Sequence, residues 1–176
     1  PRWTCRTHVK KVLGSSKTIE VGPLKNLPVI KDLVVDMDTF FDKWIAVGGV
    51  HHPSKNRHQS IEKISELSAE RMSANEAVEC INCGVCYASC DVVSANSDYF
   101  GPAALNRAWS LVNDVKTKNK DSILEAVSGN AGCHNCQSQQ NCSNYCPNEL
   151  NPSASIASLK RTVFASKINN LFGNSK

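Results

Sequence analysis

The sequence predicts a mostly α-helical protein that is preceded by a short strand-rich segment. Apolar residues recur at helical spacing over residues 36–176, and short apolar runs between Gly and Pro residues mark residues 1–35. Eight of the nine cysteines fall in two tight groups between the predicted helices. We therefore expect two parts, a sheet-like segment over 1–35 and a helical body over 36–176.

The N-terminal segment has the pattern of the end of a sheet. Residues 18–21 alternate in polarity, and the apolar runs 27–30 and 33–35 lie beside Gly and Pro residues. A strand-rich piece this short has open edges and does not close a sheet alone. We expect it to be the last part of a sheet domain whose earlier part lies outside this sequence.

A polar loop separates the first two predicted helices of the body. Asp36 or Asp38 caps a helix that carries several aromatic residues and stops at the Gly pair that follows it. Residues 49–60 are predicted to be a loop, and its three histidines to be solvated surface. A second helix is predicted over 60–79. Its apolar face and its internal capping pair comprise Ile61, Ile64, Leu67 and Met72, and Ser73 with Glu76.

Three further helices flank the cysteine groups. One begins at Gly101-Pro102, one is capped by Asp121 and ended by Gly129, and the last begins at Asn151-Pro152. The order of cysteine group, X-Pro pair and helix therefore occurs twice, which indicates a weak internal duplication.

Composition excludes several classes of protein. The chain is 41% apolar, yet no apolar run approaches the roughly 18 to 20 residues of a membrane span. A net charge of +4 is too small to argue for a nucleic-acid partner. Clustered cysteines in odd number do not suit a disulfide scaffold. We find no catalytic constellation and no Gly-rich phosphate loop, so no catalytic residue is predicted.

The first cysteine group has the spacing of iron–sulfur cluster ligands. Cys80, Cys83 and Cys86 recur every third residue, and Cys90 follows. Such a loop supplies three thiolates to a four-iron cluster, and in the bacterial two-cluster pattern the fourth cysteine of each run ligates the other cluster. We therefore predict a [4Fe-4S] cluster on Cys80, Cys83, Cys86 and Cys146.

The second group is the same pattern with one cysteine missing. Counted back from Cys146, the third position is Cys142 and the first is Cys136. The second position is Gln139, which is a poor iron ligand. Cys136, Cys142 and the crossing Cys90 are then three thiolates, which suit a [3Fe-4S] cluster.

Two points stay open at this stage. Eight cysteines could instead form two zinc ribbons, although zinc pairs are usually isolated and do not need a third thiol at the next step. Cys133 matches no position of the run. We expect it to be a small buried hydrophobe or a free thiol rather than an extra ligand that completes a four-iron cluster.

Three stretches of the chain resemble the iron–sulfur subunit of succinate dehydrogenase and fumarate reductase, the respiratory complex II family. Residues 23–37 look like its hinge segment, and 80–90 with 100–104 are similar to its first cluster run. The later cysteines resemble its second run, including the missing cysteine. The resemblance implies a helical dicluster ferredoxin-like domain, preceded by the strand-rich end of a β-grasp [2Fe-2S] ferredoxin domain.

Cys5 matches the fourth ligand of that [2Fe-2S] cluster in the family. The other three ligands would precede Pro1. The resemblance therefore implies a cluster completed by a missing N-terminal part or by a separate chain, as in the split subunits of some protist mitochondria.

The resemblance also implies a function. The chain would be the electron-transfer subunit of a succinate:quinone oxidoreductase or fumarate reductase, with no substrate chemistry of its own. It would pass single electrons between an FAD-containing dehydrogenase subunit and quinone at membrane-anchor subunits. Its place would be peripheral, at the matrix face of the mitochondrial inner membrane or the inner face of a bacterial cytoplasmic membrane. The alternative is the iron–sulfur subunit of another quinone-linked reductase, or a stand-alone dicluster ferredoxin.

The quinone-pocket residues of the family do not carry over to this sequence. The family often has Pro after the fourth cysteine of the first run, where this chain has Asp91. Many quinone-reducing members have His after the first cysteine of the second run, where this chain has Gln137. The usual His-Arg pair of the following helix is replaced by Trp109-Ser110. No quinone-binding residue is therefore predicted.

Overall fold

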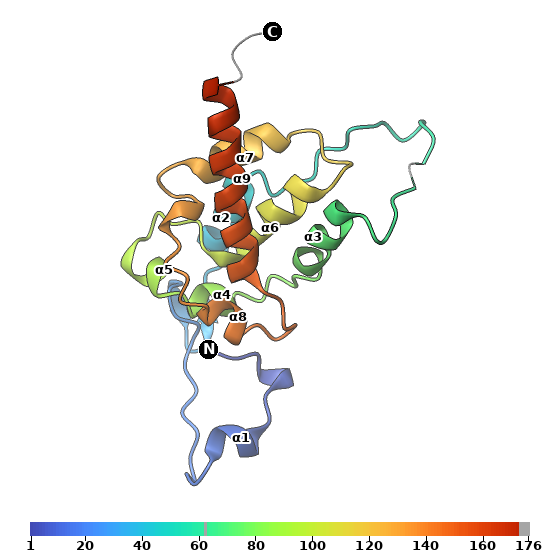
Figure 1. Ribbon diagram of the computed structural model, residues 1–176. Coiled ribbons are helices and arrows are strands. Elements are labelled where there is room, and N and C mark those ends of the chain that lie inside the picture. Colours follow the sequence, from blue (N-terminus) through green and yellow to red (C-terminus); the bar gives the residue numbers. More distant parts are fainter. Residues whose placement is uncertain (62, 173–176) are drawn as a thin grey trace.

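The computed structural model describes residues 1–61 and 63–172 (Figure 1). Helices make up most of the regular structure in these residues, and a two-stranded sheet lies between α1 and α2 in the chain. The elements in chain order are η1 (Thr4–Arg6), α1 (Val9–Leu13), β1 (Val29–Lys31), β2 (Val34–Val35), α2 (Asp38–Ala46), α3 (Ala69–Val78), α4 (Val85–Ala88), α5 (Asp91–Ala95), α6 (Pro102–Asn113), α7 (Lys120–Ser128), η2 (Cys133–Asn135), α8 (Asn141–Asn144) and α9 (Pro152–Phe172).

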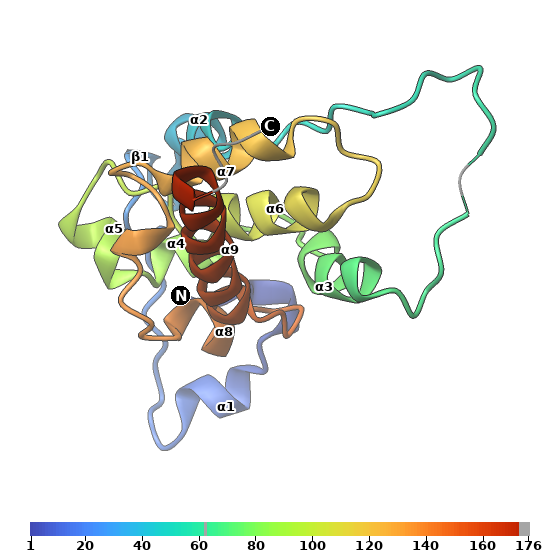
Figure 2. The same cartoon turned by 45° about the horizontal axis from the view of Figure 1, so that its top comes forward.

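Helix α6 is the centre of the helical body. It begins at Pro102, whose missing N–H would have no partner in a first helical turn. The helix contacts α2, α3, α4, α7 and α9, and α9 crosses it in both views (Figures 1 and 2). Leu105 of α6, Ile123 of α7 and Leu159 of α9 are fully buried between these helices. The three helices predicted around the cysteine groups are therefore confirmed.

The start of two helices differs in detail from the prediction. Asn119 rather than Asp121 is the N-cap residue of α7, and Asp121 lies in its first turn, where a carboxylate favours the helix dipole. Helix α2 is capped by neither Asp36 nor Asp38, because its N-cap residue is Met37, which makes no side-chain capping hydrogen bond. The Asp36 carboxylate instead accepts a hydrogen bond of 2.8 Å from the Asp38 backbone N–H just before the first turn.

The helix predicted over 60–79 is only half as long as expected. Helix α3 begins after Ser68, whose hydroxyl accepts a hydrogen bond from the Arg71 backbone N–H, so Ser68 and not Ser73 is the cap. Residue 62 and the Glu76 side chain lie outside the described residues. Ile61 and Leu67 are 89% and 84% exposed, so they form no buried face. Without such a face, a short helix before Ser68 has too little packing to be stable.

The N-terminal segment forms fewer strands than predicted. Strands β1 and β2 pair antiparallel, with Val29 opposite Val35, as the apolar runs indicate. The strand expected over 18–21 is absent from the described residues, and the chain before it forms the short helix α1 instead. A strand needs a hydrogen-bonded neighbour, and the described part of the chain offers none to 18–21. The fold is therefore helical with one small sheet.

The loop between α2 and α3 is largely without regular structure, as predicted, and it projects from the body in both views (Figures 1 and 2). In the described ranges, no helix combines the length and the apolar character needed to cross a membrane.

Candidate iron–sulfur cluster sites

The first cysteine group lies on a tight turn between α3 and α6. Cys80 and Cys83 precede α4, and Cys86 lies within that helix. Asn82 and Gly84, on either side of Cys83, have positive φ angles of 53° and 73°. Asn and Gly adopt this left-handed conformation more easily than other residues. The two left-handed residues bend the chain on either side of Cys83, and all three cysteines line one cavity.

The four cysteines predicted to hold a [4Fe-4S] cluster line one cavity. Cys80, Cys83 and Cys86 approach it from the first turn, and Cys146 approaches from the segment that follows α8. The rest of the wall is largely apolar and includes Ile81, Ala103, Leu150 and Pro152. We call this cavity the four-cysteine pocket.

A second cavity is lined by the three cysteines predicted to hold a [3Fe-4S] cluster. Cys90 reaches it from the start of α5, and Cys136 and Cys142 come from the second cysteine group. Gln139 also lines this cavity, at the position where the pattern lacks a cysteine. We call it the three-cysteine pocket. The structure thus brings together both sets of cysteines that the spacing singles out.

Burial raises the pKa of several of the pocket thiols, which makes these thiols harder to deprotonate. Burial raises the pKa of Cys86 well above its usual value, and nearby thiolates raise it further. Burial likewise raises the pKa of Cys80, where Cys83 and Cys146 add repulsion. In the other pocket burial raises the pKa of Cys142 to about 11. Several thiolates that line one cavity need a positive charge among them, which the iron of a cluster supplies. Binding of the cluster would then release the thiol protons.

Backbone N–H groups favour the thiolate form in the three-cysteine pocket. Burial raises the pKa of Cys90, but the N–H groups of Val92 and Val93, at the start of α5, act in the opposite direction. The Ser138 N–H donates to the Cys136 sulfur over 3.4 Å. Such donors are the contacts by which a protein stabilises and tunes cluster thiolates. The donor set therefore fits an iron–sulfur cluster.

Side chains from other segments fix both cysteine turns. The Asn26 amide donates to the carbonyl oxygens of Tyr87 and Cys90, at 3.0 and 3.2 Å. The Lys160 ammonium group donates to the Cys136 carbonyl oxygen at 2.7 Å. Asn141 donates to the Ser89 carbonyl oxygen at 3.3 Å and so joins the two turns. The backbone around each pocket is held by long-range contacts that sequence periodicity does not reveal.

The remaining cysteines lie outside both pockets. Cys133 is fully buried in the core, where burial raises its pKa, so its predicted burial is confirmed. Cys5 is exposed in η1 and lines neither pocket. The segment around it contacts the second cysteine group, since the Arg2 guanidinium lies over the Tyr145 ring at 5.7 Å and Arg6 reaches Asn148.

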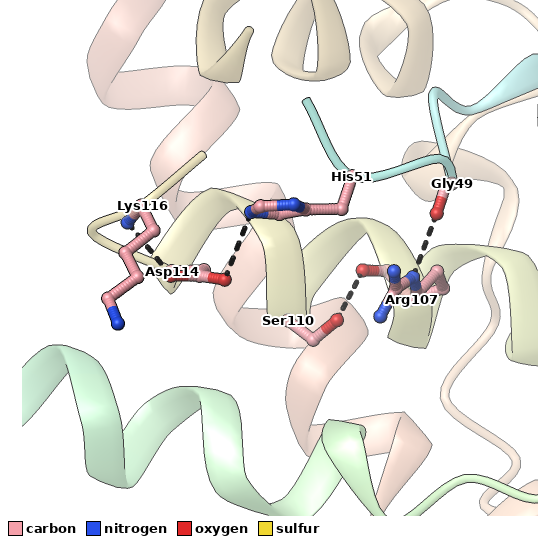
Figure 3. Close-up of polar contacts among 6 residues, drawn as sticks. All are labelled: Gly49, His51, Arg107, Ser110, Asp114 and Lys116. Atoms are coloured by element: carbon pink, nitrogen blue, oxygen red, sulfur yellow. Dashed lines mark hydrogen bonds and ion pairs between the residues drawn. The ribbon is translucent and has the colours of Figure 1, made fainter. Parts of the chain in front are cut away.

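The histidines of the loop are exposed, as predicted, but one of them has a partner. His51 Nε2 lies 3.6 Å from the Asp114 carboxylate, at the end of α6 (Figure 3). Arg107 of α6 donates to the Gly49 carbonyl oxygen at 2.9 Å, and its guanidinium lies 5.2 Å from the centre of the Trp44 ring. Burial lowers the pKa of Arg107, while Asp114 and Cys80 act in the opposite direction. These contacts hold the loop against the helix that borders the four-cysteine pocket.

Among residues 1–61 and 63–172, no group of three or more His, Cys, Asp or Glu side chains is arranged to hold a single metal ion. The ligands of a cluster bind different iron atoms, so their sulfur atoms stand farther apart than the ligands of one ion.

The cysteine geometry agrees with two family matches. Residues 76–150 match the family described as 4Fe-4S dicluster domain, and residues 1–42 match the 2Fe-2S iron-sulfur cluster binding domain. The chain is therefore an iron–sulfur protein.

Similarity to curated relatives indicates which kind of iron–sulfur protein this chain resembles. The fumarate reductase iron-sulfur subunit of Haemophilus influenzae is 29% identical over 168 residues, which cover 89% of this chain and 64% of that protein. The succinate dehydrogenase iron-sulfur subunit of Bacillus subtilis is 29% identical over 184 residues, 100% of this chain and 68% of that protein. The corresponding subunit of Paracoccus denitrificans is 32% identical over 151 residues, 82% of this chain and 56% of that protein.

A solved structure shows the same fold. A chain of the Mycobacterium smegmatis Sdh1 complex in the apo form superposes with a TM-score of 0.79 at 21% identity, covering 96% of this chain and 70% of that chain. Over most of its length this chain is therefore similar to the iron–sulfur subunits of succinate dehydrogenase and fumarate reductase. It spans 54% to 68% of the length of the curated relatives.

Proposed function

We propose that this chain is the electron-transfer subunit of a succinate:quinone oxidoreductase or fumarate reductase. Cys80, Cys83, Cys86 and Cys146 hold a [4Fe-4S] cluster, and the cysteines of the three-cysteine pocket hold a [3Fe-4S] cluster. The observation that supports this most is the division of seven cysteines into sets of four and three around two cavities. The relatives favour this function over that of a stand-alone ferredoxin.

The two pockets are neighbours on one scaffold. Pro102 lines the three-cysteine pocket and Ala103 lines the four-cysteine pocket, so the first turn of α6 lies between them. An iron–sulfur cluster accepts and releases one electron at a time. The chain's own residues hold the two sites close together and partly bury their cysteines, which favours electron transfer from one site to the other.

The partners follow from the same proposal. An FAD-containing dehydrogenase subunit exchanges electrons with one end of the chain, and membrane-anchor subunits with quinone exchange them at the other. The chain itself carries no substrate chemistry. It sits at the membrane periphery, at the matrix face of the mitochondrial inner membrane or the inner face of a bacterial cytoplasmic membrane.

Residues 1–35 complete the proposal as the end of a [2Fe-2S] sheet domain, and residues 36–176 form the dicluster domain. Val29 and Ile30 of β1 are 55% and 67% exposed, which supports packing against further sheet. In this arrangement Cys5 is the fourth ligand of a [2Fe-2S] cluster whose other ligands come from another segment or a separate chain.

The test is electron paramagnetic resonance (EPR) spectroscopy and iron analysis of single cysteine variants. Cys86→Ser should remove the [4Fe-4S] signal, and Cys142→Ser should remove the [3Fe-4S] signal. Cys133→Ser is the matched control, because this buried cysteine lines neither pocket. Loss of a cluster in the control, or zinc in place of iron in the purified protein, would contradict the assignment. Copurification of a flavoprotein with the chain tests the partners.

A further inference from the structure

Each cysteine pocket contains one buried polar side chain that has no hydrogen-bond partner. Asn106 of α6 lines the four-cysteine pocket, is 1% exposed, and neither atom of its amide is hydrogen-bonded. Tyr99 lines the three-cysteine pocket and is fully buried, and its hydroxyl lacks a partner in the same way. Neither residue belongs to a ligand motif in the sequence, and only Asn106 stands out there, as a polar residue that follows the apolar run 103–105.

Unpartnered polar groups of this kind are rare, because burying a donor or acceptor without a hydrogen bond destabilises the fold. Asn106 sits on the buried side of α6 between Leu105 and Ala108, where an apolar side chain would serve packing better. Phe in place of Tyr99 would fill the same volume without the hydroxyl. The Asn106 amide N–H therefore needs an acceptor that the surrounding side chains do not provide. The Tyr99 hydroxyl has no well-formed partner either, and the Cys136 sulfur is the group near enough to interact with it.

The surroundings indicate which acceptor is missing. Besides Asn106, the four-cysteine pocket is walled largely by apolar side chains and the sulfur atoms of its cysteines. Tyr99 borders the same cavity as Cys90 and Cys136. A cluster in either pocket adds inorganic sulfide and thiolate sulfur, which accept hydrogen bonds but do not donate them.

We propose that the Asn106 amide N–H and the Tyr99 hydroxyl each donate a hydrogen bond to sulfur of the cluster in their own pocket, and so raise its reduction potential. The inference rests on the cluster assignment proposed above. Reduction adds an electron and makes the cluster more negative, so a donor to sulfur stabilises the reduced form more than the oxidised form. The two residues are positioning and tuning groups, because they ligate no iron.

A reciprocal pair of variants tests this in the full chain, reconstituted with iron and sulfide under anaerobic conditions. Asn106→Leu and Tyr99→Phe each remove the donor and keep a side chain of similar shape. EPR-monitored redox titration then gives the midpoint potential of each cluster. Asn106→Leu should lower the potential of the [4Fe-4S] cluster alone, and Tyr99→Phe that of the [3Fe-4S] cluster alone. Each variant thus controls for the other.

The outcomes separate the inference from the proposed function. Clusters that load with unchanged potentials, or a shift only in the cluster of the opposite pocket, overturn the inference and leave the proposed function standing. A parent chain that takes up neither cluster overturns the proposed function and the inference with it. If Asn106→Leu does not retain its clusters, Asn106→Ala makes the same measurement with a smaller side chain. A purely structural role would change thermal stability and leave both potentials in place.

Discussion

The two cysteine turns have similar backbone conformations, and they differ at one proposed ligand position, which is Cys83 in the first turn and Gln139 in the second. Asn82 and Gly84 have positive φ angles of 53° and 73°, and Ser138 and Gln140, at the equivalent positions of the second turn, have 58° and 63°. In both turns a four-residue helix follows, α4 in one and α8 in the other. The chain therefore forms the same type of turn around both cysteine groups.

Hydrogen bonds repeat in the same register. The Ala88 N–H donates to the Gly84 carbonyl oxygen at 2.9 Å, and the Asn144 N–H donates to Gln140 at 3.0 Å. Because the φ angles and hydrogen bonds of the two turns share this register, Gln139 holds the position that Cys83 holds in the first turn. The comparison teaches that the backbone determines where a cluster can sit, and that a single side chain determines how many thiolates it receives.

Exchanging that side chain is expected to have the largest effect. Gln139→Cys should convert the proposed [3Fe-4S] cluster to a [4Fe-4S] cluster of lower potential, because an added anionic ligand stabilises the oxidised state. EPR spectroscopy and iron analysis give the cluster type. The reverse variant, Cys83→Gln, should leave three thiolates in the four-cysteine pocket. If Gln139→Cys folds and its three-iron signal is unchanged, residue 139 does not face the cluster and the shared register of the two turns has no chemical meaning.

The next prediction concerns the helix that both turns share. Leu105 of α6 is fully buried between α6, α7 and α9. Leu105→Ala should lower the free energy of unfolding by about 2–5 kcal/mol, through lost burial and the cavity that remains. Chemical denaturation followed by circular dichroism measures this. Leu67→Ala is the matched control, because Leu67 is 84% exposed and should change stability by less than about 0.5 kcal/mol. Equal effects of the two variants would show that α6 is not the common support.

Each turn also depends on one donor from a distant segment, and these donors are not equivalent. Asn26 donates to three carbonyl oxygens of the first turn and has a positive φ angle of 65°, whereas Lys160 donates to one carbonyl oxygen of the second turn. Asn26→Ala should therefore cost about 2–3 kcal/mol and Lys160→Met about 1 kcal/mol. Thermal denaturation of the loaded chain compares them. A larger loss in Lys160→Met would reverse this ranking.

Much of the cluster chemistry could be predicted from the sequence, because cluster ligands are close together in the chain. The spacing around Cys80 and the register counted back from Cys146 identified both sets of cysteines that the structure gathers. The long helices α6 and α9 were also predictable, since each starts at an X-Pro pair. In α9 the helical spacing of Ile156, Leu159 and Val163 marks the part that is buried, whereas Leu171 near its end is exposed.

The parts that could not be predicted depend on packing between distant segments. Residues 18–21 alternate like a strand, but a strand forms only beside another strand. Ile61 and Leu67 have helical spacing, but they have no surface to pack against. Helices as short as α4 and α8 leave no periodic signal, and the isolation of Tyr99 and Asn106 appears only when every neighbour is in place.

The smallest expected effect tests the repeated backbone itself. Gly84 and Gln140 occupy the same left-handed position, just before α4 and α8. A residue with a Cβ is disfavoured there by about 1–2 kcal/mol relative to Gly. Gly84→Ala should therefore destabilise the chain by about 1 kcal/mol, since the new Cβ would also lie 3.4 Å from the Met37 side chain. Gln140→Gly should stabilise the chain by up to about 1 kcal/mol. The gain is reduced because Gly has more backbone entropy in the unfolded chain, which folding must overcome. Chemical denaturation measures both, and EPR spectra check that the clusters are unchanged. If the two variants change the free energy of unfolding in opposite directions, the second turn carries strain that the first avoids with Gly. If both change it in the same direction, the two turns are not energetically alike, despite their matching φ angles.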